Sequence, residues 1–415
     1  MKIIYIGLIS FFYKMIKKNI LFYIPSLSQD LGGVRQYACS LLKLFPDLAN
    51  TYKFFIYHDN KDPNIINVLK ENPQFKLIKP GQFKLSKLSN LISLFKYFSL
   101  KVLSIMKNNP TDYVRESDLD FVVDKFSIDI IHCPYQFLPV FPNSRKKKIK
   151  LIVTMHDVQE LHFPEFFSAE SRAFRAVSYM NYINRADSVV VSYDHVKGDI
   201  KNFFNKNDES IFVILLKMSN LWFKKYDHLK FKRIEIVDKY LFYPANFWKH
   251  KNHHRLVEAI KYLKVNNNLH INLILTGDFN TTEGPILNKL IEEFDLMCQI
   301  KILGIVSEEE LFHLYKNSIG VVIPTLYEAG SFPLMESILM EIPVICSNVT
   351  SLPETIGNEM FIFDPYSIED ISKKIELLWN SKEFRNQSIE NSKIQQIRLI
   401  NTNAVSILHS IYKMN

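Results

Sequence analysis

Two glutamates, Glu328 and Glu336, frame the segment of the sequence with the most specific chemical potential. A buried strand is predicted to end at Pro324. A helix is predicted to begin near Ser331 to Pro333, because a hydroxyl residue followed by proline is typical of a helix start. The first N–H groups of such a helix favour an anion such as a diphosphate. Carboxylates, in turn, accept hydrogen bonds from the hydroxyls of a sugar or ribose.

The segment therefore predicts a site for a ligand with both phosphates and hydroxyls, such as a nucleotide sugar. We expect Glu336 in the first turn or so of the helix, facing the same mouth as Glu328. The alternative is a surface glutamate on a loop and a second glutamate placed by the helix dipole. Two carboxylates around one anion site favour the nucleotide sugar.

The composition is that of a globular protein of two or three domains. The chain has 415 residues, of which 47% are hydrophobic and 23% charged. The net charge is +8, and the densest basic run lies within residues 145–150. That run is either a solvated loop or a contact with anionic lipid headgroups.

Several other chemistries are excluded by the motifs that the sequence lacks. There is no P-loop, no G-x-G-x-x-G after a strand, no G-x-S-x-G and no H-E-x-x-H. Basic residues do not interleave with aromatic ones as on a nucleic-acid face. The four cysteines are far apart, which predicts reduced, buried thiols rather than disulfides or a zinc site. Asp118-Leu119-Asp120 spells D-x-D, but it lies in a polar stretch that predicts a solvated helix face.

The elements that must position the glutamates form two alternating series, which is typical of β-α-β units on parallel sheets. The first series has predicted strands at 20–24, 54–57, 128–132, 151–155 and 188–192 and a helix at 169–185. The second has predicted strands at 241–245, 271–276, 301–303, 320–324, 344–347 and 361–363, with helices at 253–264, 284–294 and 307–317. Because parallel sheets bind ligands beyond the carboxyl ends of their strands, two such domains predict a site in the cleft between them.

The predicted organisation has four parts. Residues 1–218 form an N-terminal Rossmann-like domain for the acceptor, 219–238 a linker, 239–395 a C-terminal Rossmann-like domain for the nucleotide sugar, and 396–415 a C-terminal helix packing back on the first domain. Residues 1–18 are an extra strand, a membrane-contacting extension or a product of an early start codon. Residues 83–107 are either a core helix or a lipid-facing one.

The glutamate segment resembles the E-x7-E motif of glycosyltransferase family 4, a retaining family with the GT-B fold. Glu328 and Glu336 match the two glutamates of that motif. The resemblance implies that Glu328 contacts the donor sugar and Glu336 the ribose. It also implies that backbone amides of Gly330, Ser331, Phe332 and Pro333 hold the diphosphate and the sugar.

Further motifs fall in the order of the same family. They are Gly32 and Gly33 in the N-terminal glycine loop, His156 in T-x-H-D, Asn246 and Lys251 in the cationic loop, and the turns at Gly277 and Leu303. The resemblance implies that His156 lines the reaction centre and that Lys251 contacts the diphosphate. Asn246 stands where the family usually has arginine, and Lys249, His250 or Arg255 are the candidate replacements.

The resemblance implies a retaining glycosyltransferase that needs no metal or cofactor and uses a GDP- or UDP-sugar. The G-S-F-P and N-F-W-x-H-K-N variants are similar to those of bacterial mannosyl- and glycosyltransferases of surface polysaccharide synthesis. The implied acceptor is a glycan or lipid-linked saccharide. The implied location is the cytoplasm, with peripheral contact to the inner membrane, and no nucleic-acid partner. The alternatives are a nucleotide-sugar-binding protein with weak or no turnover and, on the same fold, an epimerase or phosphorylase.

Overall fold

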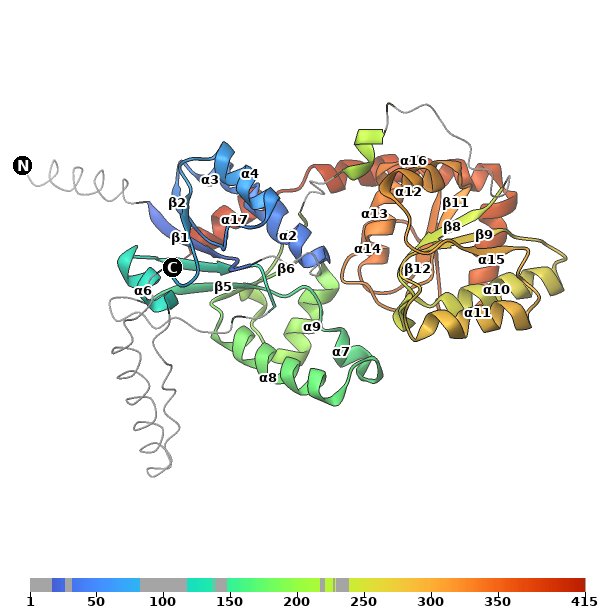
Figure 1. Ribbon diagram of the computed structural model, residues 1–415, viewed down its shortest axis with the longest axis horizontal. Helices are drawn as coiled ribbons and strands as arrows, with labels where there is room; N and C mark the ends of the chain where they lie inside the picture. The colour runs from blue at the N-terminus through green and yellow to red at the C-terminus, as the bar shows by residue number, and fades with distance from the viewer. Residues whose placement is uncertain are drawn as a thin grey trace, which may run out of the picture.

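The computed structural model describes residues 17–26, 32–82, 118–136, 138, 148–216, 221–226, 228 and 239–414. These residues form two α/β domains, each built on one sheet, lying side by side along the long axis of the molecule (Figure 1). All strand pairs between described residues are parallel. The predicted fold class, two Rossmann-like domains, is confirmed.

The first domain has a seven-stranded sheet in the order β3-β2-β1-β4-β5-β6-β7. The strands are β1 (Lys18–Tyr23), β2 (Tyr52–Tyr57), β3 (Lys76–Ile78), β4 (Ile130–Cys133), β5 (Lys150–Thr154), β6 (Ser188–Val191) and β7 (Ile211–Val213). The helices are α2 (Gly32–Leu42), α3 (Phe45–Leu48), α4 (Pro63–Glu71), α6 (Asp118–Lys125), α7 (Gln159–His162), α8 (Ala169–Arg185) and α9 (Asp194–Phe204), with short 3-10 helices η2 (Pro164–Phe166) and η3 (Asp208–Ser210).

Alternation along the central strand β1 divides the core of this domain into two layers, because successive side chains of a strand point to opposite faces. Ile20 and Phe22 pack with α2, α3 and α4, whereas Leu21 and Tyr23 pack with α6, α8 and α9. A strand covered by helices on both faces is buried along its whole length, as the residues of β6 are.

The second domain has a six-stranded sheet in the order β10-β9-β8-β11-β12-β13. The strands are β8 (Leu241–Pro244), β9 (Leu273–Thr276), β10 (Ile300–Ile302), β11 (Gly320–Ile323), β12 (Val344–Ser347) and β13 (Ile362–Phe363). The helices are α10 (His253–Asn266), α11 (Glu283–Glu293), α12 (Glu308–Asn317), α13 (Phe332–Leu339), α14 (Leu352–Ile356), α15 (Ile368–Asn380) and α16 (Lys382–Ile400), with 3-10 helices η4 (Trp222–Tyr226), η5 (Lys249–Lys251) and η6 (Glu359–Phe361).

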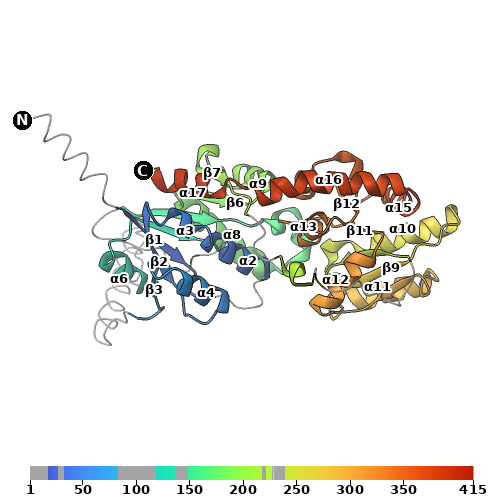
Figure 2. The same cartoon turned by 90° about the horizontal axis from the view of Figure 1, so that it is seen from above.

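The last helix, α17 (Ala404–Lys413), lies on the first domain, so the chain crosses between the domains twice (Figures 1 and 2). Tyr412 is fully buried there, and its hydroxyl shares a 2.8 Å hydrogen bond with Nδ1 of His132 on β4. The ammonium groups of Lys18 and Lys150 donate to carbonyls of the last turn at 2.7 to 3.3 Å. Cations at a helix C-terminus bind its free carbonyls and its negative dipole end, which fixes α17 in place.

The segment expected to be a linker has structure of its own where it is described. Residues 222–226 form η4, and Phe223 is buried in the core of the second domain. Residues 227 and 229–238 lie outside the described residues, as do 1–16, 83–117 and 139–147, so the alternatives for those stretches stay predictions.

Two smaller expectations need correction. Asp118-Leu119-Asp120 is helical, but its face is not solvated. Asp120 is buried, and Oδ2 of Asp118 accepts hydrogen bonds from the Tyr57 hydroxyl and the Gly81 amide. Among the cysteines, all four are free thiols and three are buried, but Cys298 is exposed.

Candidate functional site

Two pairs of strand ends define where the site lies. In each sheet the strand order reverses once, between β1 and β4 in the first domain and between β8 and β11 in the second. Loops that leave neighbouring strands in opposite directions at such a point open a crevice for a ligand. The loops that follow β8 and β11 carry Lys251 and Glu328, so the sheet topology brings these two distant residues together.

Lys251 and Glu328 form a buried ion pair in which Nζ of the lysine lies 2.5 Å from Oε1 of the glutamate. Each side chain is only about a tenth exposed, at 12% and 10%. Asn252 joins the two loops, since its side-chain amide donates to the carbonyl of Pro324 at 2.8 Å. The pair therefore places one cation and one hydrogen-bond acceptor side by side at the point where the strand order reverses.

The loop after Glu328 leads into the N-terminus of α13. Ser331 is the N-cap residue, but its side chain makes no capping hydrogen bond. Its hydroxyl is buried and has no hydrogen-bond partner among the described residues. The free amides at this end carry a partial positive charge. The predicted helix start at Ser331 to Pro333 agrees with α13, and the unpartnered hydroxyl adds a donor for an anion.

Glu336 lies at the start of the second turn of α13, within the first turn or so that we expected. It is the fifth residue of this helix, and both of its oxygens are held by other side chains. Oε1 accepts from the indole Nε1 of Trp222 at 2.7 Å, and Oε2 accepts from the hydroxyl of Tyr315 at 2.9 Å. Burial raises the pKa of the Glu336 carboxyl, and these two hydrogen bonds oppose the rise. The carboxylate is preorganised by neighbours that the motif itself does not contain.

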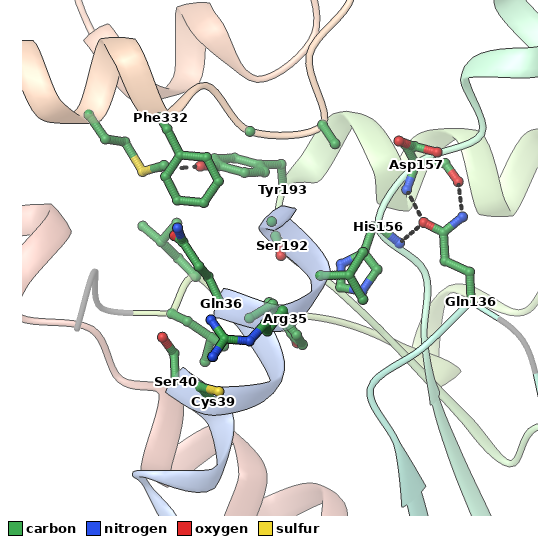
Figure 3. Close-up of a pocket in the computed structure, with 18 of the residues that line it drawn as sticks. Arg35, Gln36, Cys39, Ser40, Gln136, His156, Asp157, Ser192, Tyr193 and Phe332 are labelled. Atoms are coloured by element: carbon green, nitrogen blue, oxygen red, sulfur yellow. Dashed lines mark hydrogen bonds between the residues drawn. The ribbon is translucent and has the colours of Figure 1, made fainter. Parts of the chain in front are cut away.

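A cavity of about 390 Å³ lies between the two domains, beside these loops (Figure 3). Its walls come from α2 in the first domain, including Gln36 and Ser40, and from the start of α13 in the second, including Phe332 and Met335. Figure 3 shows the ring of Phe332 directed toward α2. A volume of this size accommodates a small ligand that contacts both domains at once.

His156 lines this cavity from the loop after β5, and its place at the reaction centre stays a prediction. Its Nε2 lies 2.9 Å from the carbonyl of Pro134, so Nε2 carries the proton and Nδ1 keeps its lone pair. Burial lowers the pKa of His156, which favours the neutral ring. The ring meets that of Tyr37 edge to face, with centroids 4.8 Å apart.

Gln136 is a site residue that the sequence analysis missed. Its Oε1 accepts from the amides of His156 and Asp157 at 3.0 and 3.1 Å, and its Nε2 donates to the hydroxyl of Tyr179 at 2.6 Å (Figure 3). Gln136 thereby fixes the loop that carries His156. The available signal was its place after β4, at the switch point of the first sheet.

Asn246, which stands where the resembled family has arginine, is used structurally. Its Oδ1 accepts from the amide of Asp278 at 2.8 Å and so ties together the loops after β8 and β9. Gly277 in that second loop has φ +132°, and an added Cβ would lie 2.5 Å from the carbonyl oxygen of Ala245. The close packing explains the glycine. The amide of Gly277 continues the chain of contacts by donating to the carbonyl of Gly304, next to Leu303.

The three candidate replacements for the arginine differ in what they can supply. Burial and the nearby charge of Lys251 lower the pKa of His250 to about 3, so this ring is neutral. Arg255 donates to Asn252 and stacks on Tyr366. The ammonium of Lys249 lies 5.4 Å above the ring of Phe166 in the first domain. Lys249 is therefore the candidate that reaches across the cleft.

The domains contact each other through aromatic side chains next to the loop that carries Glu328. Tyr327 is 3% exposed and packs against His162, Phe163 and His195 of the first domain. The residue after the next, Ala329, lines the cavity. Glu328 thus lies between a contact with the first domain and the ligand cavity.

Gly33 and Gly330 are both closely approached across the cleft. A Cβ at Gly33 would lie 3.3 Å from Cε2 of Phe332, and one at Gly330 would lie 2.8 Å from Cε2 of Tyr193. Gly32 begins α2 at the same end of the first domain. The glycines permit the two domains to approach here.

Two absences concern only the part of the chain that the structure describes. No group of three or more His, Cys, Asp or Glu side chains there is arranged to hold a metal ion. Within the same residues, no helix has the length and apolar character needed to cross a bilayer.

Two doubly wound domains with a ligand cleft between them define the GT-B class, and comparison with a solved structure agrees. The Anabaena Alr3699/HepE structure in complex with UDP and glucose matches with a TM-score of 0.60 at 15% identity, over 95% of this chain and 98% of that one. At this level of identity the likeness concerns the fold.

Residues 227–395 match the family model described as glycosyl transferases group 1, so this part of the chain is similar to that family. The match confirms the kind of family inferred from the motifs, while the particular motif subgroup stays a prediction.

Two curated relatives carry the comparison further along the chain. "O-antigen chain mannosyltransferase B" of Escherichia coli is 26% identical over 253 residues, which is 59% of this chain and 64% of the relative. "O-antigen chain mannosyltransferase RfbU" of Salmonella typhimurium is 26% identical over 213 residues, covering 51% and 56%. The matched segments span less than two thirds of either relative.

Proposed function

We propose that the chain is a retaining glycosyltransferase that moves a sugar from a nucleotide-sugar donor to a saccharide acceptor. The observation that carries the proposal is the buried pair of Lys251 and Glu328 beside the free N-terminus of α13, at the cleft between the domains. A cation, free amides and a carboxylate in one place are complementary to a diphosphate linked to a sugar.

In the proposed reaction the second domain holds the donor. The Lys251 ammonium moves from Glu328 to the diphosphate, where it stabilises the charge that develops as the bond between the sugar C1 and the phosphate oxygen breaks. The freed carboxylate of Glu328 then accepts hydrogen bonds from hydroxyls of the donor sugar. The acceptor oxygen forms its bond to C1 on the same face, and its proton passes to the leaving phosphate.

The first domain supplies His156 and the acceptor side of the cleft. With Nε2 bonded to the Pro134 carbonyl, Nδ1 is available to accept a hydrogen bond from a sugar hydroxyl. The contacts between the domains through Tyr327 exclude water, which would otherwise hydrolyse the donor.

For the donor sugar we place mannose first, because the E. coli and Salmonella relatives are named as O-antigen mannosyltransferases. GDP- and UDP-sugars both remain candidates, since the HepE structure holds UDP. The proposed acceptor is a glycan or lipid-linked saccharide of a surface polysaccharide. The proposed place of action is the cytoplasmic face of the inner membrane.

The test incubates the purified protein with GDP-mannose and a panel of UDP-sugars, with and without lipid-linked saccharide acceptors. We expect transfer from one donor, and we expect Glu328→Ala to lower it by about 100-fold or more, since the group acts on the transition state. Glu309→Ala, which changes an exposed glutamate at the start of α12, is the matched control.

The result also separates a transferase from a protein that only binds. A nucleoside diphosphate raises the melting temperature in both cases. If the folded protein binds nucleotide but neither transfers nor hydrolyses any donor, the transferase is rejected in favour of the binding protein.

A further inference from the structure

The connector between the domains, of which η4 is the described helix, packs on the second domain beside Glu336. Within η4, Phe223 is buried in the core of the second domain. The ring of Tyr226 packs against Phe312 on α12, with centroids 5.8 Å apart. This anchoring fixes Trp222, the first residue of η4, relative to α12 and α13.

Trp222 and Tyr315 hold Glu336 from two sides. The indole N–H and the phenol O–H each donate to a different carboxylate oxygen, at 2.7 and 2.9 Å. Tyr315 is fully buried, and burial raises its pKa well above its usual value, so the phenol stays protonated and remains a donor.

We propose that Trp222 and Tyr315 are positioning residues that present Glu336 to the ribose of the bound nucleotide, so that the connector is part of the nucleotide site. This inference rests on the proposed function, in which Glu336 accepts the hydroxyls of a nucleotide ribose.

The hydrogen-bonding capacity of a carboxylate supports this assignment. An ionised carboxylate has about four acceptor positions, two on each oxygen. Trp222 and Tyr315 use one position on each oxygen of Glu336. One position on each oxygen remains, and two adjacent acceptors match the spacing of two vicinal hydroxyls. Fixing the rotamer beforehand reduces the entropy lost when the nucleotide binds.

The test compares ribose with deoxyribose nucleotides. Dissociation constants of UDP, GDP and their 2′-deoxy forms are measured by calorimetry for the wild type, Trp222→Phe and Tyr315→Phe. Both variants keep an aromatic ring and remove one donor. Each variant loses one hydrogen bond to the Glu336 carboxylate, which then no longer holds its position for the ribose. We expect this loss to weaken binding of the preferred ribonucleotide about tenfold, with little change for its deoxy form. The preference for ribose over deoxyribose then falls toward one.

Tyr226→Phe, in the same short helix, is the control for a general disturbance of the connector and should leave the preference unchanged. Three outcomes overturn the inference while leaving the proposed function intact. They are equal binding of ribo and deoxy forms by the wild type, an unchanged preference in Trp222→Phe, and tighter binding in that variant, which would mean that the indole covers the site. If the wild type binds neither UDP nor GDP, the proposed function itself fails.

Discussion

At the scale of single residues, Lys251 and Glu328 form an ion pair in which each compensates the charge of the other. Removing one partner of a buried pair leaves an uncompensated charge, whereas removing both charges leaves none. Stability and function should therefore respond differently to single and double substitutions at these positions.

Lys251→Met is expected to lower the free energy of unfolding of the second domain by about 3 kcal/mol, because Glu328 stays buried without its partner. Adding Glu328→Gln should recover most of this stability but none of the transfer activity. Urea denaturation and a transfer assay measure the two quantities. Lys289→Met, which breaks an exposed pair with Glu293, should cost less than about 1 kcal/mol. Equal losses in the single and double variants would contradict the expectation.

The loop and the helix that carry the two glutamates were predictable, whereas the partners of these side chains were not. The motif identified Glu328 and Glu336 because helix starts and carboxylates leave local signals. The hydrogen bond from Trp222 to Glu336 joins residues 114 positions apart, and no local pattern encodes it. Gln136 was not predicted for the same reason, since its role depends on how β4 lies beside β5.

At the scale of elements, short apolar runs predicted the strands of both sheets except β3 and β7, because buried parallel strands are mostly apolar. The two missed strands are three residues long and lie at the edges of the first sheet. The helix predicted at 169–185 coincides with α8, which Ser168 caps by accepting from the Ser171 amide. The structure of the connector was harder to predict from the sequence. Residues 222–226 are charged and aromatic without a period, yet they pack on α12, because burial of Phe223 decides the matter rather than local propensity.

The C-terminal helix α17 offers a test at this scale. Tyr412→Phe removes the hydrogen bond to the buried ring of His132, and we expect the first domain to lose about 1–3 kcal/mol of stability. Thermal and urea unfolding measure the loss. Tyr366→Phe, at a residue that is 53% exposed, serves as the control and should change little. Equal effects of the two substitutions would mean that the buried hydrogen bond adds nothing.

At the scale of the whole molecule, each domain contains a buried neutral histidine. Burial lowers the pKa of His132 in the first domain and of His253 in the second to about 3. The unfolded chain takes up these protons near pH 6.5. Both histidines therefore favour the folded state above that pH, and their contribution is lost as the pH falls toward 3.

His132 and His253 are each expected to cost their domain about 2 kcal/mol of unfolding free energy between pH 7.5 and pH 5, at about 1.4 kcal/mol per pH unit below pH 6.5. Denaturant unfolding at the two pH values measures this loss. His253→Gln should remove the share of the loss that comes from His253, while the share from His250 in the same domain and the dependence of the first domain stay. A stability that does not change with pH would refute the assignment of neutral histidines.

The return of α17 to the first domain also bears on how the protein is made. Leu408, Ile411 and Tyr412 complete a core layer whose first members are residues of β1. A ribosome synthesises the whole second domain before it reaches them. The first domain therefore leaves the exit tunnel with one apolar layer open to solvent, and it closes that layer only after the second domain has been synthesised. During synthesis, the residues of the second-domain core are therefore all present before those of the first-domain core.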